Sequence, residues 1–251
     1  MYEPWLLPAG LLIAAPIIGS FIGVLVMRLP ELRPIVQARS TCEYCNEQLG
    51  ARDLLPIVSW LSNRARCRRC GAKLSIFYPL VEVSAFAAAA WAALVTSGWL
   101  LAATVVLGWI LLALALIDWR AQLLPDVLTI PLAAAGIAVT WIMRPAALAE
   151  HLLGLAGGAL AFIAIGAAYR ATRKQEGIGL GDAKLLGALG AWISWSGLPT
   201  AVVYAGVIGL SGVFVLSLAG QPVTTRDRLP LGTFLALGGW LVWLYGPLTF
   251  G

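Results

Sequence analysis

Long apolar runs, each close to the length of a membrane span, dominate this chain. A transmembrane helix needs about 20 consecutive, mostly apolar residues. Read against that length, the pattern predicts an all-α polytopic membrane protein with about eight transmembrane helices. The sixth run is short, so the division between residues 183 and 219 is the least constrained. The expected spans are 5–27, 79–97, 99–118, 125–143, 150–169, 183–197, 199–219 and 230–248.

Composition supports the membrane assignment. The 251 residues are 60% hydrophobic and only 12% charged, whereas soluble domains carry about 25% charged residues. The first run is not a cleavable signal peptide, because it begins with Glu3 rather than a basic segment and ends against Arg28. The chain is therefore expected to be an integral, multi-pass membrane protein.

The basic residues predict an orientation. Nine of the 17 Lys and Arg residues lie in 28–73, directly after the first span, which predicts that the N-terminus is outside and that 28–78 is cytoplasmic. With eight spans, only Arg144 lies away from the predicted cytoplasmic side. The clustering indicates a cytoplasmic segment beside anionic lipid headgroups rather than a nucleic-acid surface.

The polar segment 28–78 contains all four cysteines, as "CEYC" and "CRRC". Two C-x2-C pairs at this spacing are typical of a zinc ribbon, in which four thiolates close a tetrahedral structural site. Disulfides are disfavoured in the reducing cytoplasm, and a redox motif needs only one pair. We therefore expect zinc as a structural cofactor, bound by Cys42, Cys45, Cys67 and Cys70.

Two aspartates lie at the predicted cytoplasmic ends of spans. Asp118 ends the third span and Asp182 opens the sixth. A helix C-terminus disfavours a negative charge, so Asp118 needs either a partner such as Arg120 or a function. If the two aspartates face each other, one can take a proton from water while the other protonates a carbonyl oxygen, as aspartyl proteolysis requires. Asp118 and Asp182 are thus the predicted catalytic pair.

The turn around Asp182 is rich in glycine, as "GIGLGDAKLLG". Gly179 and Gly181 would let an extended peptide approach the backbone closely, and with Lys184 they are the expected substrate-positioning residues. The turn is neither G-x-G-x-x-G nor a Walker A motif, because Lys184 takes the place of the last glycine and is followed by Leu185. A nucleotide site is therefore not expected.

These motifs together resemble those of the type IV prepilin peptidases, the leader peptidases of pilus and type II secretion systems. The resemblance covers nearly the whole length and rests on four motifs in order: "GSFIGVLVMRLP", "CEYC…SWLSNRARCRRC…YPLVE", "DWRAQLLPD" and "GLGDAKLLG". It implies a G-x-G-D intramembrane aspartyl protease of the bacterial inner membrane that cuts the short basic leader of prepilins or pseudopilins after glycine at the cytoplasmic face. Many such enzymes then methylate the new N-terminus with S-adenosylmethionine, an activity linked to the cysteine-bearing segment.

Two departures from the family pattern fall in the part linked to methylation. Gly23 stands where the family usually has Asn, and Glu43 stands where it usually has Pro. Two alternatives therefore stay open: a peptidase whose cysteine-bearing segment is only a scaffold, and a transporter whose aspartates relay protons beside a regulatory zinc ribbon. Transporters usually place such carboxylates near the midplane and contain repeats, whereas both aspartates here lie at one face.

The expected organisation has three parts. Residues 1–27 form the first transmembrane helix, 28–78 the cytoplasmic metal-binding segment with the four cysteines (the Cys segment), and 79–251 the transmembrane aspartyl peptidase domain. Glu82, near the cytoplasmic start of the second span, is expected either to hydrogen-bond substrate or the zinc segment, or to stabilise a helix N-terminus. The sequence does not identify the S-adenosylmethionine site or the oligomeric state.

Overall fold

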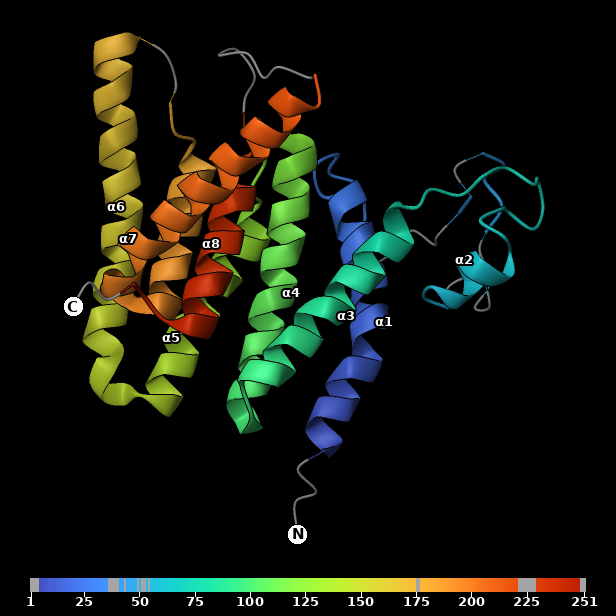
Figure 1. Ribbon diagram of the computed structural model, residues 1–251, viewed down its shortest axis with the longest axis horizontal. Coiled ribbons are helices and arrows are strands. Elements are labelled where there is room, and N and C mark those ends of the chain that lie inside the picture. Colours follow the sequence, from blue (N-terminus) through green and yellow to red (C-terminus); the bar gives the residue numbers. More distant parts are fainter. Residues whose placement is uncertain are drawn as a thin grey trace. The chain divides into compact units, whose positions relative to one another are not determined.

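The computed structural model describes residues 5–35, 41–42, 44–48, 50, 53, 55–174, 177–220 and 229–248. Over these residues the regular secondary structure is helical, apart from two isolated antiparallel bridges in the Cys segment. The elements are α1 (Leu6–Arg28), α2 (Val58–Ser62), α3 (Phe77–Val95), α4 (Gly98–Ala121), α5 (Asp126–Met143), the short 3-10 turn η2 (Pro145–Ala147), α6 (Leu148–Arg173), α7 (Leu180–Leu218) and α8 (Leu231–Tyr245) (Figure 1).

The helices confirm the predicted all-α membrane class. Within the described residues, six helical segments are long and apolar enough to cross a bilayer, and α8 is a shorter apolar helix of 15 residues. α7 alone has 39 residues, which would extend about 58 Å as a straight helix, roughly twice the hydrocarbon thickness. It therefore accounts for both the sixth and the seventh predicted span.

A break at Ser194 divides α7. Ser194 has φ 59° and ψ 176°, outside the helical region, and its hydroxyl lies 2.8 Å from that of Ser196. Pro199 follows five residues later, and a proline disturbs the helix at the carbonyl four residues before it. The sequence placed the division near residue 198, so the observed break comes a few residues earlier.

The chain reverses direction at this break, as contacts with α8 show. Before it, Leu189 packs on Gly239, and Gly181 and Gly232 both pack on Leu124, so this half runs parallel to α8. After it, Gly209 packs on Phe234 and Gly197 on Val242, so the second half runs antiparallel. α7 therefore forms two spans joined at Ser194, which agrees with the prediction of eight spans.

The chain divides into two compact units, Met1–Ala113 and Leu114–Gly251. In the first, α1 packs closely on α3, because a Cβ at Gly19 would lie 2.6 Å from the Cα of Glu82. The indole N–H of Trp109 in α4 donates to the carbonyl oxygen of Ala85 in α3 at 3.1 Å. A glycine in α1 and one hydrogen bond from α4 thus fix α3 in this unit.

In the second unit, glycines bring α6 and α7 together (Figure 1). A Cβ at Gly190 would collide with the backbone of Gly154, and a Cβ at Gly158 would lie 2.9 Å from the carbonyl oxygen of Leu186. Small residues of this kind let transmembrane helices approach each other closely. This packing positions the start of α7, which carries Asp182.

Candidate active site and metal site

Asp118 is buried at the end of α4, with 5% of its surface exposed. Its Oδ2 accepts a hydrogen bond from the backbone N–H of Thr233 at 2.8 Å and lies 3.2 Å from the Thr233 hydroxyl. That hydroxyl also donates to the carbonyl oxygen of Ala115 at 2.8 Å. Thr233 lies in the first turn of α8, where the helix dipole favours a carboxylate. Asp118 is therefore held by the N-terminus of a second helix.

Asp182 lies in the first turn of α7 and is partly buried. Its Oδ2 accepts the backbone N–H of Gly179 at 3.3 Å, so the side chain caps its own helix. Gly179 has φ −72° and ψ 150°, which any residue can adopt. A Cβ at Gly179 would lie 3.2 Å from Asp182 Oδ2, so a side chain there would crowd the carboxylate.

The two aspartates share one neighbourhood around Leu124, a residue with 7% exposure. A Cβ at Gly181, the residue before Asp182, would lie 3.1 Å from the Leu124 Cβ. A Cβ at Gly232 would lie 2.8 Å from Leu124 Cδ1 and 3.0 Å from the Cγ of Asp118. The fold thus brings together two groups that the sequence separates by 64 residues.

Lys184 has a partner that the sequence did not predict. Its Nζ donates to both carboxylate oxygens of Asp126, at 2.7 and 2.9 Å, and both side chains are about half exposed. Asp126 begins α5, where the helix dipole favours a carboxylate. The ion pair therefore links the start of α5 to the start of α7, two residues from Asp182.

The four cysteines form a compact cluster in the other unit. Their sulfur atoms all lie within 4.8 Å of one another, and the thiols of Cys42 and Cys70 are 3.9 Å apart. A tetrahedral zinc with Zn–S bonds of about 2.3 Å needs sulfur separations of about 3.8 Å. The cluster is therefore able to hold a metal ion in this geometry.

Two backbone turns of the same design build the cluster. The N–H of Cys42 donates to the carbonyl oxygen of Glu47, and the N–H of Cys67 donates to that of Ala72, both at 2.9 Å. The bridges Thr41↔Gln48 and Arg66↔Lys73 close the two turns. Equivalent backbone bonds in both turns are what the repeated C-x2-C pattern predicts.

The thiols differ in their ease of ionisation. The backbone N–H groups of Cys70 and Arg69 lower the pKa of Cys67 to about 7. The N–H of Glu47 acts in the same direction on Cys45, but desolvation and the neighbouring thiols outweigh it and raise that pKa to about 11. The Cys67 thiol therefore ionises more readily than the Cys45 thiol, and a bound cation would favour the thiolate form of both.

Models of two protein families match the chain. The Bacterial Peptidase A24 N-terminal domain matches residues 13–96, and the Type IV leader peptidase family matches residues 105–214. The first region contains the cysteine cluster, and the second contains both aspartates. No solved structure matches.

Curated relatives cover almost the whole chain. The Prepilin leader peptidase/N-methyltransferase of Aeromonas hydrophila is 33% identical over 269 residues, which cover 97% of this chain and 92% of that protein. The protein of the same name from Burkholderia pseudomallei (strain K96243) is 36% identical, with 96% and 87% covered. The Type 4 prepilin-like proteins leader peptide-processing enzyme of Escherichia coli O78:H11 is 34% identical, with 94% and 93% covered.

The chain belongs to the type IV leader peptidase family. The resemblance found in the four sequence motifs is confirmed, and the transporter interpretation is not favoured. Of the two departures from the leader peptidase pattern, Gly23 packs against Tyr78, whose Cδ1 would lie 3.0 Å from a Cβ at that position. Glu43 lies outside the described residues.

Sequence reasoning missed Gly232 and Thr233, which contact Asp118. A signal was present: Pro230 directly precedes the last apolar run, and proline is common at helix starts, so Gly232 and Thr233 were expected in a first helical turn on the side predicted for both aspartates. For Glu82, the sequence predicted the kind of contact that the structure contains. Its carboxylate accepts the N–H of Ile57 at 2.6 Å, within the Cys segment, as one of the two expectations for it required.

Proposed function

We propose that this chain cleaves the short leader from type IV prepilins and related pseudopilins with Asp118 and Asp182 as its catalytic pair. The observation that carries the proposal is the shared neighbourhood of the two carboxylates around Leu124. Each carboxylate also has a backbone N–H donor at a helix N-terminus, from Thr233 for Asp118 and from Gly179 for Asp182. Two oriented carboxylates from different helices suit acid–base hydrolysis of a peptide bond.

The pair would act as one unit. One carboxylate takes a proton from the attacking water, and the other gives a proton to the oxygen of the scissile carbonyl. Close carboxylates titrate together, so the proton that they share belongs to the pair. The hydrogen bond from Thr233 to Oδ2 orients the Asp118 carboxyl group before substrate arrives, which reduces the reorganisation needed for reaction.

Residues beside Asp182 would position the substrate. Gly179 is exposed and has no side chain, so an extended peptide could run close to its backbone. Gly181 allows the first turn of α7 to pack on Leu124. Lys184, through its ion pair with Asp126, would hold the starts of α5 and α7 in register beside the peptide.

The second activity would be N-methylation of the new N-terminus, with S-adenosylmethionine as methyl donor. Two observations support it: the relatives are named both as leader peptidases and as N-methyltransferases, and they match nearly the whole chain. The cysteine cluster would bind structural zinc, because four thiolates at these separations suit a tetrahedral ion. A segment of about 50 residues has little core of its own, so a metal would stabilise its fold.

The division into parts and the orientation belong to the same proposal. Residues 1–27 and 28–78 would supply the first span and the methylation-linked Cys segment, and 79–251 the peptidase domain. The basic residues of 28–73 favour a cytoplasmic location for that segment, and the parity of eight spans puts Asp118 and Asp182 on the same side. The N-terminus would then be outside.

The first experiment tests the catalytic pair. Detergent-purified protein is incubated with a prepilin precursor and S-adenosylmethionine, and the products are weighed by mass spectrometry. Asp118→Asn and Asp182→Asn should each reduce the cleavage rate by about 10²–10⁴-fold, because each removes one proton-transfer group. Glu150→Gln on α6 is the matched control and should cleave at the wild-type rate. Cleavage that survived either Asp→Asn change would exclude that residue from the pair.

A further inference from the structure

Asp126 is an exposed carboxylate close to the proposed catalytic pair, and it has no part in the proton transfers described above. Its side chain is 54% exposed, whereas Asp118 is buried and Asp182 is partly buried. The other acidic residue described in the second unit is Glu150, in the first turn of α6. That end of α6 packs on the break in α7 rather than on its start. Over the described residues of this unit, Asp126 is therefore the one exposed carboxylate on the side of the catalytic pair.

The path along the chain from the catalytic pair to Asp126 is short. Asp126 follows Leu124 by two residues, and Leu124 lies against Gly181 and Gly232 beside the two aspartates. Pro125 between them is extended, with φ −71° and ψ 135°. The Cα atoms of Leu124 and Asp126 are therefore at most about 7 Å apart. A peptide at the catalytic pair thus lies within reach of Asp126 for a long side chain.

Lys184 demonstrates this reach for a cation. It follows Asp182 by two residues on α7, and its Nζ donates to both carboxylate oxygens of Asp126, at 2.7 and 2.9 Å. In the described part of the chain, Lys184 is the only partner assigned to the Asp126 side chain. The free protein thus pairs this carboxylate with a cation of its own, of the kind that a lysine or arginine of a substrate supplies.

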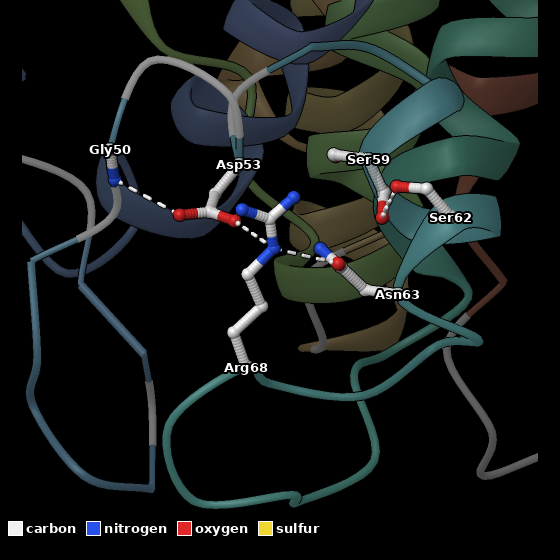
Figure 2. Close-up of polar contacts among 6 residues, drawn as sticks. All are labelled: Gly50, Asp53, Ser59, Ser62, Asn63 and Arg68. Carbon is white, nitrogen blue, oxygen red and sulfur yellow. Dashed lines mark hydrogen bonds and ion pairs between the residues drawn. The ribbon is translucent and has the colours of Figure 1, made fainter.

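A carboxylate of the first unit shows what a purely structural ion pair looks like (Figure 2). Asp53 is only 25% exposed and lies 3.2 Å from the Nε of Arg68. It also accepts the N–H of Gly50 at 3.3 Å, and the same Nε donates to Asn63 Oδ1 at 2.8 Å. Several contacts therefore fix that pair within the Cys segment. Asp126 has no second contact of this kind among the described residues, so its carboxylate is available for exchange.

Contacts further along the helices hold α5 on α7 without the ion pair. The indole N–H of Trp192 in α7 donates to the carbonyl oxygen of Leu132 in α5 at 2.8 Å, in a buried position. A Cβ at Gly136 would lie 2.6 Å from the same indole ring. An ion pair between half-exposed side chains contributes little beside such contacts. A substrate cation can therefore replace Lys184 at Asp126 without separating the two helices.

Of the two partners, Asp126 is the fixed one. Its short side chain belongs to the first residue of α5, where the helix dipole favours a carboxylate. Lys184 carries its charge on a flexible four-carbon stem, so it can turn aside while Asp126 stays in place. The nearby carboxylates of Asp118 and Asp182 also favour an arriving cation over an anion, because complementary charges steer association.

We propose that Asp126 selects the substrate: it binds a lysine or arginine side chain of the leader close to the scissile bond, in the place that Lys184 occupies in the free protein. The inference rests on the proposed leader cleavage and adds a residue that determines its specificity. Asp126 is then a binding residue, remote from the reacting atoms. An interaction of this kind is equally strong in the ground state and the transition state, so it acts on KM rather than on kcat.

The test compares two precursors that differ only in the leader, one with its lysines and arginines and one with glutamine in their place. Both kcat and KM are measured for the full-length protein in detergent. The wild type should prefer the basic leader by about three- to tenfold in kcat/KM, through KM. Asp126→Asn should lose this preference, because the amide carries no charge. Lys184→Met is the matched variant: it breaks the same ion pair but keeps the Asp126 carboxylate, so it should keep at least the wild-type preference.

Glu150→Gln removes a carboxylate elsewhere in the second unit and should leave kcat and KM unchanged for both precursors. A wild type that cleaves the two precursors equally, or prefers the neutral leader, would overturn the inference, as would a wild-type preference in Asp126→Asn. Loss of the preference in both Asp126→Asn and Lys184→Met would also overturn it, because the ion pair and not the carboxylate would then be what matters. If the wild type cleaves neither precursor, the proposed leader cleavage fails as well.

Discussion

At the scale of single residues, Asp118 depends on α8. The carboxylate ends α4, where its own helix dipole is unfavourable, yet it accepts the N–H of Thr233 in the first turn of another helix. Gly232 lies directly against it, with its Cα too close to Asp118 and Leu124 to carry a side chain comfortably. The favourable N-terminus of α8 offsets the unfavourable C-terminus of α4, which explains how a buried carboxylate is tolerated there.

This packing predicts the effect of Gly232→Ala. The added Cβ would lie 3.0 Å from Asp118 Oδ2 and 2.8 Å from Leu124 Cδ1, so the carboxyl group must move. A shift of about 1 Å in a catalytic group can reduce a rate by about a hundredfold, and we expect a loss of that size in prepilin cleavage. Gly206→Ala, with nothing within 4 Å of the added Cβ, should cleave normally. Equal rates in the two variants would argue against this role for Gly232.

At the scale of helices, the reversal inside α7 depends on one strained residue. Ser194 adopts φ 59° and ψ 176°, a combination that glycine favours and that costs other residues about 1–3 kcal/mol. Its hydroxyl contact with Ser196 offsets part of that cost, since a hydrogen bond contributes about 0.5–1.5 kcal/mol.

Because the strain exceeds the hydrogen bond, Ser194→Gly should stabilise the protein by about 1 kcal/mol and raise its Tm by a few degrees. Ser194→Val should lower the Tm, because a β-branched residue is least able to adopt this backbone geometry. The measurement is thermal unfolding in one detergent, with Ser217→Gly near the end of α7 as a comparison. A Tm in Ser194→Gly below that of the wild type would show that the hydroxyl contact matters more than the strain.

The Cys segment makes a second prediction at the scale of elements. With zinc bound, the purified protein should contain about one zinc per chain, measured by elemental analysis, and Cys67→Ser should lower that content strongly. Methylation should fall by a larger factor than cleavage, because the cysteines belong to the first unit and both aspartates to the second. Equal loss of the two activities would indicate that the metal supports the peptidase as well.

At the scale of the whole molecule, the distribution of charge predicts the orientation. Of the Lys and Arg residues, only Arg144 lies away from the predicted cytoplasmic side. Alkaline phosphatase, which is active only outside the cytoplasm, should be active when fused after Arg144 and inactive when fused after Lys174. Activity after Lys174 would place the start of α7, and Asp182 with it, on the outer side.

The sequence by itself determined the features that depend on neighbours along the chain. Apolar runs predicted the spans, since the bilayer requires a minimum length, and the paired C-x2-C motifs predicted the thiol cluster, since each knuckle closes through local backbone bonds. The two aspartates were identified by their places at span ends. These features need no information about which helices meet.

Only the tertiary structure decided which distant groups meet. Thr233 reaches Asp118 across 115 residues, and Ile57 reaches Glu82 across 25, and neither contact follows from spacing or periodicity. The break of α7 at Ser194 rather than near residue 198 likewise reflects the fit of two half-helices against α8. Side-chain packing between helices selects these contacts, and an apolar pattern that marks a helix as buried in membrane does not specify its neighbours.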